Sequence, residues 1–170
     1  NDDSMARYFY SPPLDGAQAL RGSARAMLIA REFAAADDYR TQIVIRVVSN
    51  NGSVVRGTLY AGDVGALVTE LDSTASTARR FPQAADAILA SVAALDGDRI
   101  LVEIGVRQHS ATVTNATISF NDPSTADIAP GDETATTGAS WIEFTGIIKF
   151  RAELTADWMY DQQAFVANGL

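Results

Sequence analysis

The chain has 170 residues, of which 47% are hydrophobic and 20% are charged, and its formal net charge is −8. These values are typical of one folded globular domain and exclude an intrinsically disordered chain. The acidic balance disfavours nucleic acids and anionic membranes as partners.

The basic residues form no visible patch in the sequence. Several of them stand among acidic and apolar neighbours, namely Arg21, Arg25, Arg31, Arg40, Arg46, Arg56 and Arg79. The chain has no cysteine, which excludes disulfides, thiolate metal sites and cysteine nucleophiles. Its apolar stretches are also far too short to span a membrane.

Hydrophobic residues alternate with a period of two, which is typical of strands rather than helices. The first expected strands are residues 7–10, which end before Pro12 and Pro13, and residues 19–32. The second segment has an alanine-rich face that also fits a helix. Its strict alternation and Gly22 favour a strand.

A hairpin is the clearest local prediction. Residues 41–49 are rich in β-branched residues, and one face carries Ile43, Ile45 and Val47. The pair Asn51-Gly52 follows and can supply the positive φ values of a type I′ turn. Residues 53–60 return as the second strand, with Val55 and Leu59 on one face.

A second apolar row lies in residues 99–107 and consists of Ile100, Val102, Ile104 and Val106. We expect this row to line the core. The turn before it contains Gly97, at a position that needs positive φ. Residues 87–93 are expected to form the preceding strand, with a short helix as the alternative because alanine is frequent there.

Weaker strands are expected at residues 117–121, 140–145 and 146–154. The pattern predicts an all-β fold, a two-sheet antiparallel jelly roll or β-sandwich of about eight or nine strands with a C-terminal extension. We expect the sandwich in residues 1–155 and the extension in residues 156–170.

Candidate catalytic and metal-binding residues are few. His109 is the single histidine, and no Gly-x-Ser-x-Gly motif accompanies it. The loop 121–133 holds four acidic residues, Asp122, Asp127, Asp132 and Glu133, but not in the spacing of a calcium-binding loop. We therefore predict no enzymatic activity and no catalytic, cofactor-binding or metal-binding residues.

Two aromatic features are candidates for binding. Trp141 is out of phase with Ile142 and Phe144, so it either covers the second face of its sheet or stacks on a sugar. The residues of the C-terminal tail that we predict to be assembly contacts are Trp158, Met159, Tyr160, Phe165 and Val166. Aromatic residues and Met are enriched at interfaces, although the tail can equally fold back on its own sheet as a short helix.

Four segments resemble a jelly-roll domain that recurs in virion structural proteins of tailed bacteriophages. They are VVSNNGSVVRGTL at 47–59, RFP at 80–82, SVAALDGDRILVEIG at 91–105 and WIEF at 141–144. The likeness extends over residues 8–145; residues 138–140 depart from it, because an Asp-rich run and a Pro are usual there.

The resemblance implies a non-enzymatic protein of the virion, either a capsid decoration or a tail-associated protein. Its implied partners are other virion proteins such as the major capsid protein, and we expect a closed homo-oligomer, a trimer. No nucleic acid, membrane or cofactor is expected. The alternative function is a carbohydrate-binding module that holds a glycan on Trp141 or on loop aromatics.

Overall fold

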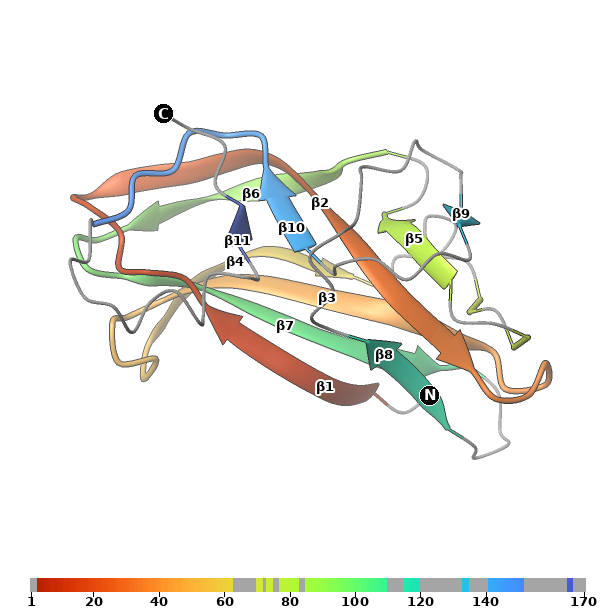
Figure 1. Ribbon diagram of the computed structural model, residues 1–170. Helices are drawn as coiled ribbons and strands as arrows, with labels where there is room; N and C mark the ends of the chain where they lie inside the picture. The colour runs from red at the N-terminus through yellow and green to blue at the C-terminus, as the bar shows by residue number, and fades with distance from the viewer. Residues whose placement is uncertain are drawn as a thin grey trace, which may run out of the picture.

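The computed structural model describes residues 3–62, 70, 71, 73, 74, 77–82, 85–109, 115–119, 133–134, 141–151 and 165–166. Within these residues the chain forms eleven strands and no helix. The strands make two sheets that lie in two layers (Figure 1). The prediction of an all-β, two-sheet fold is therefore confirmed for the described part of the chain.

One sheet has four strands in the order β1-β7-β3-β4, and all neighbours are antiparallel. The bounds are Asp3–Tyr10 for β1, Arg99–Gln108 for β7, Tyr39–Val48 for β3 and Val55–Gly62 for β4. Strands β1 and β4 are thus the two edges of this sheet.

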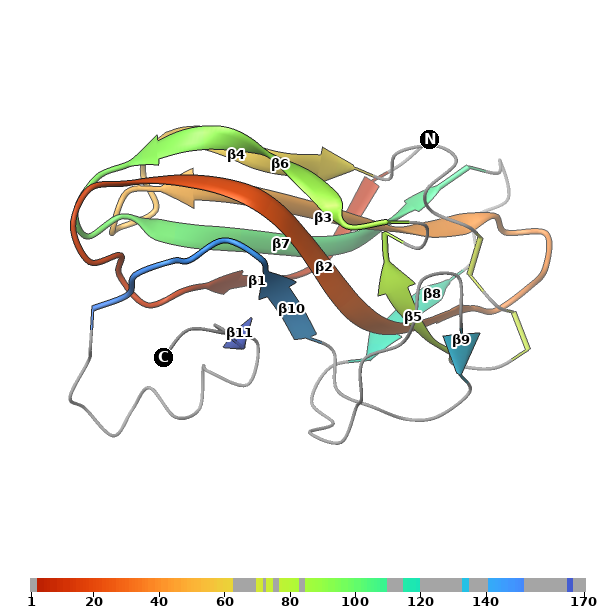
Figure 2. The same ribbon diagram turned by 90° about the horizontal axis from the view of Figure 1, so that it is seen from above.

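The second sheet is built around the long strand β2, Gln18–Glu32, which crosses over β3 and β7 (Figure 2). Two strands pair in succession with each edge of β2. On one edge these are β6, Ala87–Ala94, and β5, Thr77–Phe81; on the other they are β10, Trp141–Phe144, and β8, Ala116–Ser119. The two-residue strand β9, Glu133–Thr134, pairs with β5, and β11, Phe165–Val166, pairs in parallel with β10.

The core lies between the sheets and contains the predicted apolar rows. Buried residues of the four-stranded sheet include Ile43, Ile45, Val47, Ile100, Val102, Ile104 and Val106. The second sheet supplies Leu20, Ala24, Ala26 and Leu28 from β2. The strand predictions for residues 19–32, 41–49 and 99–107 are confirmed, and residues 87–93 form a strand rather than a helix.

Strand β4 departs from simple alternation. Leu59 is buried, but Val55 is 55% exposed, so the prediction that they share a face is wrong. The register between β3 and β4 shifts twice, because Arg56 and Leu59 are extra residues opposite β3. After each extra residue, the side chains that follow point to the opposite face of the sheet from the one that simple alternation predicts.

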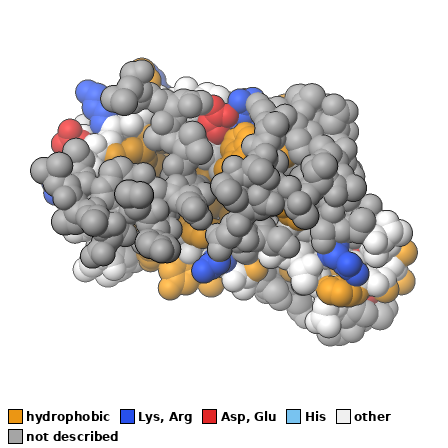
Figure 3. Space-filling model, in the orientation of Figure 1, with side chains coloured by type: hydrophobic (Ala, Val, Ile, Leu, Met, Phe, Trp, Pro, Cys, Tyr) orange, Lys and Arg blue, Asp and Glu red, His pale blue; other side chains and the backbone are white. Residues whose placement is uncertain are grey.

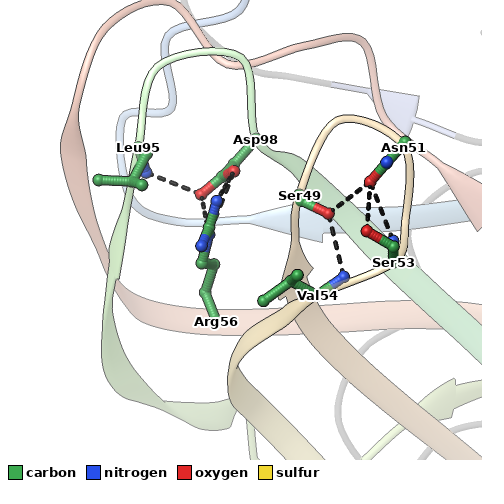
Figure 4. A network of polar contacts seen from close by, with 7 residues as sticks. All are labelled: Ser49, Asn51, Ser53, Val54, Arg56, Leu95 and Asp98. Carbon is green, nitrogen blue, oxygen red and sulfur yellow. Dashed lines mark hydrogen bonds and ion pairs between the residues drawn. The ribbon is translucent and has the colours of Figure 1, made fainter.

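The β3–β4 hairpin is confirmed, but the prediction of a type I′ turn is wrong. Gly52 has a φ of +74°, whereas the φ of Asn51 is not positive, and a type I′ turn needs both. The Ser49 amide donates to the Val54 carbonyl at 2.8 Å, and the Gly52 amide donates to the Ser49 carbonyl at 2.7 Å. The loop therefore has four residues, and the Asn51 side chain accepts hydrogen bonds from the hydroxyls of Ser49 and Ser53 (Figure 4).

The predicted strand 146–154 is wrong for its described residues, 146–151, which form only an isolated bridge between Phe150 and Leu14. The Arg151 amide donates to the Pro13 carbonyl at 2.8 Å, so this segment pairs with the loop after β1 rather than with a strand. The Gln18 side chain also binds this segment. Its amide nitrogen donates to the Lys149 carbonyl at 2.9 Å, and its amide oxygen accepts from the Lys149 backbone amide at 3.1 Å.

Candidate interaction surface

Most of the predicted assembly contacts lie outside the described residues, namely Trp158, Met159 and Tyr160. Phe165 and Val166 form β11, whose backbone pairs with Ile142 and Glu143 of β10. These two tail residues therefore lie on the protein's own sheet, and they form a strand rather than the helix considered as an alternative. Their role in assembly stays a prediction.

The acidic loop 121–133 lies outside the described residues except for Glu133, whose backbone belongs to β9. His109 is described, and its amide donates to the Asp38 carbonyl at 2.9 Å. Among the described residues, no three His, Asp or Glu side chains form a group that could hold a metal ion.

Trp141 lies on the outer face of the second sheet. It is half-buried and packs against Met27 and Ile29 of β2, which are 1% and 5% exposed. Arg25 and Glu143 form an ion pair on the same face, 2.7 Å apart. The prediction that Trp141 covers the second face of its sheet is confirmed.

On the outer face of the four-stranded sheet, most of the outward side chains of β3 and β7 are half-buried rather than fully buried. Tyr8 and Tyr10 of β1 are 55% and 40% exposed, and their rings meet edge to face at 5.8 Å. Val55 is exposed at the opposite edge. We name this surface the outer sheet face and define it by the residues that the strand register places on it, namely Asp3, Met5, Tyr8, Tyr10, Arg40, Gln42, Val44, Arg46, Val48, Val55, Thr58, Ala61, Arg99, Leu101, Glu103, Gly105 and Arg107.

Arginines lie in both sheets: β2 and β5 carry five of them, and the four-stranded sheet brings together others from distant parts of the chain, which the sequence did not reveal. Six of the 13 basic residues lie in its four strands, namely Arg7, Arg40, Arg46, Arg56, Arg99 and Arg107. They come from segments far apart in the chain, and pairing between β3 and β7 places Arg40 directly opposite Arg107. Space filling shows hydrophobic and basic side chains next to one another along the lower margin of the molecule, the side on which β1 lies (Figures 1 and 3).

Acidic residues compensate part of this charge, and the pairing of β1 with β7 places Asp3 directly opposite Arg107. Arg46 forms an ion pair with Glu103 in the middle of the outer sheet face. Arg40 lies 3.3 Å from the carboxylate of Asp38, which has a φ of +47° in the turn before β3. Like charges directly opposite one another weaken a sheet, so the Asp38 carboxylate offsets the repulsion between Arg40 and Arg107.

A group of buried carboxyls lies where β2 turns into β3. Glu32 and Asp37 are each 1% exposed, and Glu32 accepts a hydrogen bond from the Tyr39 amide at 3.0 Å. Burial raises the pKa of Glu32, and the hydrogen bond from the Tyr39 amide lowers it. The neighbouring acids Glu70, which is hydrogen-bonded to Glu32, and Asp37 raise this pKa further. Glu32 therefore keeps its proton to a higher pH in the folded protein than an ordinary Glu does.

A small cavity lies between the two sheets, with a volume of about 10 Å³. Apolar side chains such as Ala24, Ala26 and Ile43 form much of its wall. Small-molecule sites usually need about 300 Å³ or more. This cavity is therefore too small for such a ligand, and the outer sheet face is the stronger candidate for binding.

Comparison with protein-family models, with curated proteins and with solved structures gave no match for this chain. None of the described residues belongs to a helix that could span a membrane.

Proposed function

We propose that this protein is a non-enzymatic structural protein of a tailed-bacteriophage virion, a capsid-decoration or tail-associated protein that acts through protein–protein contacts. The observation that carries the proposal is the outer sheet face, an open sheet surface that combines exposed tyrosines with arginines. Tyr and Arg are the residue types that are enriched at protein interfaces.

The segments that resemble phage virion proteins support the proposal through their place in the fold. Segments 47–59 and 91–105 meet at one end of the molecule. There Arg56 binds Asp98 (Figure 4). Arg99 also donates to the Asn50 side chain at 2.9 Å. These contacts hold two turns together, as expected of a rigid scaffold that presents its surfaces to neighbours.

The jelly-roll topology is part of the same proposal. The chain crosses between the sheets after β1, β2, β4, β6 and β7, whereas β3 and β4 are joined by a hairpin. Repeated crossing between two packed sheets is the kind of connection that jelly rolls have.

In this proposal the protein resides in the virion, and its partners are other virion proteins such as the major capsid protein. It forms a closed homo-oligomer, a trimer, and it binds neither nucleic acid nor membranes. The second candidate function is a carbohydrate-binding module. The exposed Tyr8 and Tyr10 favour it, because aromatic rings on an open sheet can pack against a sugar.

The copy number of the protein in purified particles tests the proposal. We expect quantitative mass spectrometry of virions to find a fixed ratio to the major capsid protein, and this ratio should survive further purification. A protein that is missing from particles contradicts the proposal. Micromolar binding of the isolated protein to a defined glycan, together with its absence from particles, favours the carbohydrate-binding alternative.

A further inference from the structure

We propose that Glu32 and Glu70 form a proton-dependent clasp, which holds residues 70–71 on the turn between β2 and β3 at acidic pH and releases them as the pH rises. The clasp consists of a buried carboxyl, an exposed carboxyl and the backbone groups of Tyr39 and Leu71. It is a conformational device within the fold, and it does not rest on the proposed function.

Four residues form a closed set of contacts beside this turn. The Tyr39 amide donates to Glu32 Oε2 at 3.0 Å, and the Leu71 amide donates to the Tyr39 carbonyl at 2.8 Å. A hydrogen bond between the side chains of Glu32 and Glu70 completes the set. The Leu71 side chain is 4% exposed and belongs to the same buried apolar cluster as Tyr39. Residues 70–71 are thus held by a backbone hydrogen bond, an apolar contact and a pair of carboxyls.

The hydrogen bond between the two carboxyls needs a proton, because two ionised carboxylates can only accept. Glu32 is 1% exposed, whereas Glu70 is exposed to water, which solvates a charged carboxylate. Glu32 is therefore the donor and the Glu70 carboxylate the acceptor, in a charge-assisted hydrogen bond. This bond raises the pKa of Glu32, as expected for a carboxyl that donates.

The charges around Glu32 also oppose its ionisation. Among the described residues, every charge that shifts the pKa of Glu32 is negative, namely those of Glu70 and Asp37. The nearby arginines contact other groups, since Arg31 lies 4.5 Å over an aromatic ring and Arg40 lies 3.3 Å from a carboxylate of the turn. Loss of the proton from Glu32 therefore removes the hydrogen bond to Glu70 and adds a like charge beside it, which opens the clasp.

The turn between β2 and β3 is expected to stay intact when the clasp opens. The hydrogen bond from the Tyr39 amide lowers the pKa of Glu32, as expected for a bond that favours the ionised form. Glu32 can therefore accept this bond with or without its proton. The change is local to residues 70–71, and the two sheets need not separate.

The test measures amide hydrogen exchange of the full chain by NMR from about pH 4 to 8, as protection relative to the unfolded-chain rate at each pH. We expect the protection of the Leu71 amide to fall at least about fivefold as the pH rises, which is the lower end of typical coupling between two sites. At pH about 8 it should also lie below that of the Ile104 amide in the core, because residues 70–71 open locally.

Glu32→Gln should lock the clasp closed, because the Gln amide donates to the Glu70 carboxylate, accepts from the Tyr39 amide and does not ionise. The Leu71 amide should then stay protected over the whole pH range. Glu70→Gln replaces an exposed residue and should also flatten the profile, so it carries the test if Glu32→Gln does not fold.

Two controls should keep the wild-type fall in Leu71 protection. Glu143→Gln makes the same change at a carboxylate that pairs with an arginine on the outer face of the second sheet. His109→Gln removes the histidine whose backbone amide donates to the turn, because histidine side chains titrate within this pH range. Loss of the fall in His109→Gln assigns the titration to the histidine and overturns the clasp.

Three other results overturn the inference. The first is a Leu71 protection that does not change with pH in the wild type. The second is a folded Glu32→Gln variant that keeps the wild-type fall. The third is equal protection of the Leu71 and Ile104 amides at high pH, which would show that residues 70–71 separate only when the whole fold opens.

Discussion

Arg56 and Asp98 form an ion pair that joins the edge strand β4 to the turn before β7 (Figure 4). The Asp98 side chain is 3% exposed, and it accepts hydrogen bonds from the Arg56 guanidinium at 3.1 Å and from the Leu95 amide at 2.8 Å. A buried carboxylate needs such partners, because burial without them costs free energy. The pair therefore anchors β4 to the turn that connects β6 of the second sheet with β7.

Replacing Arg56 by Met should leave the Asp98 carboxylate buried without its cation. We expect Arg56→Met to lower the free energy of unfolding by about 1.5–3 kcal/mol, as measured by urea denaturation. The control is Arg21→Met, an exposed position on β2, which should change stability by less than about 0.5 kcal/mol. Equal losses of unfolding free energy in the two variants would show that the ion pair contributes nothing to stability.

The turn at Gly52 should not tolerate a β-branched residue. Gly52 has a φ of +74°, and a Cβ added there would lie 2.8 Å from the Tyr10 hydroxyl. We expect Gly52→Val to destabilise the fold by about 1–3 kcal/mol, seen as a lower melting temperature. Adding Tyr10→Phe removes the contact with the hydroxyl and should restore only part of the loss, because the backbone strain remains. An unchanged melting temperature for Gly52→Val would contradict the role of this turn.

Shortening a side chain in the apolar row of β7 should lower the free energy of unfolding strongly. Ile104 is 6% exposed within the core, so Ile104→Ala should cost about 2–5 kcal/mol in denaturant titration. Ile147 is 83% exposed, and Ile147→Ala should cost less than about 0.5 kcal/mol. A small loss at Ile104 would place that row outside the core.

Glu32 should make stability depend on pH. Its pKa is raised in the folded protein, chiefly by burial, so its contribution to stability is complete below the ordinary pKa of a Glu, about 4.3. That contribution is lost as the pH rises through the folded pKa. Glu32→Gln keeps an oxygen for the Tyr39 amide and cannot ionise. Its unfolding free energy should therefore fall less than that of the wild type as the pH rises from about 4 to 7.

Asp96 provides the opposite case in the same measurement. Its pKa is lowered, first by the hydrogen bond from the Gly16 amide at 2.8 Å and then by Arg151. Its contribution is present above the ordinary pKa of an Asp and is lost as the pH falls. Asp96→Asn should therefore flatten the acid side of the stability profile, and parallel profiles for Asp96→Asn and Glu32→Gln would contradict both assignments.

Local sequence patterns determined the strands in which one face is apolar. The rows on β3 and β7 and the hairpin at Gly52 followed from alternation and turn residues, because these depend on neighbours close in the chain. The strand at residues 87–94 also followed from alternation, which outweighed its alanine content.

Tertiary structure alone decided features that depend on distant partners. The bulges of β4 arise from its pairing with β3, and residues 146–151 find their hydrogen-bond partners in the loop after β1. The outer sheet face, our strongest candidate site, is also of this kind, since its arginines lie in β3 and β7 and meet only when the sheet forms. A period-two pattern states which face a residue occupies within its own strand, but not which strands lie beside it, so charge gathered across a sheet is invisible in the sequence.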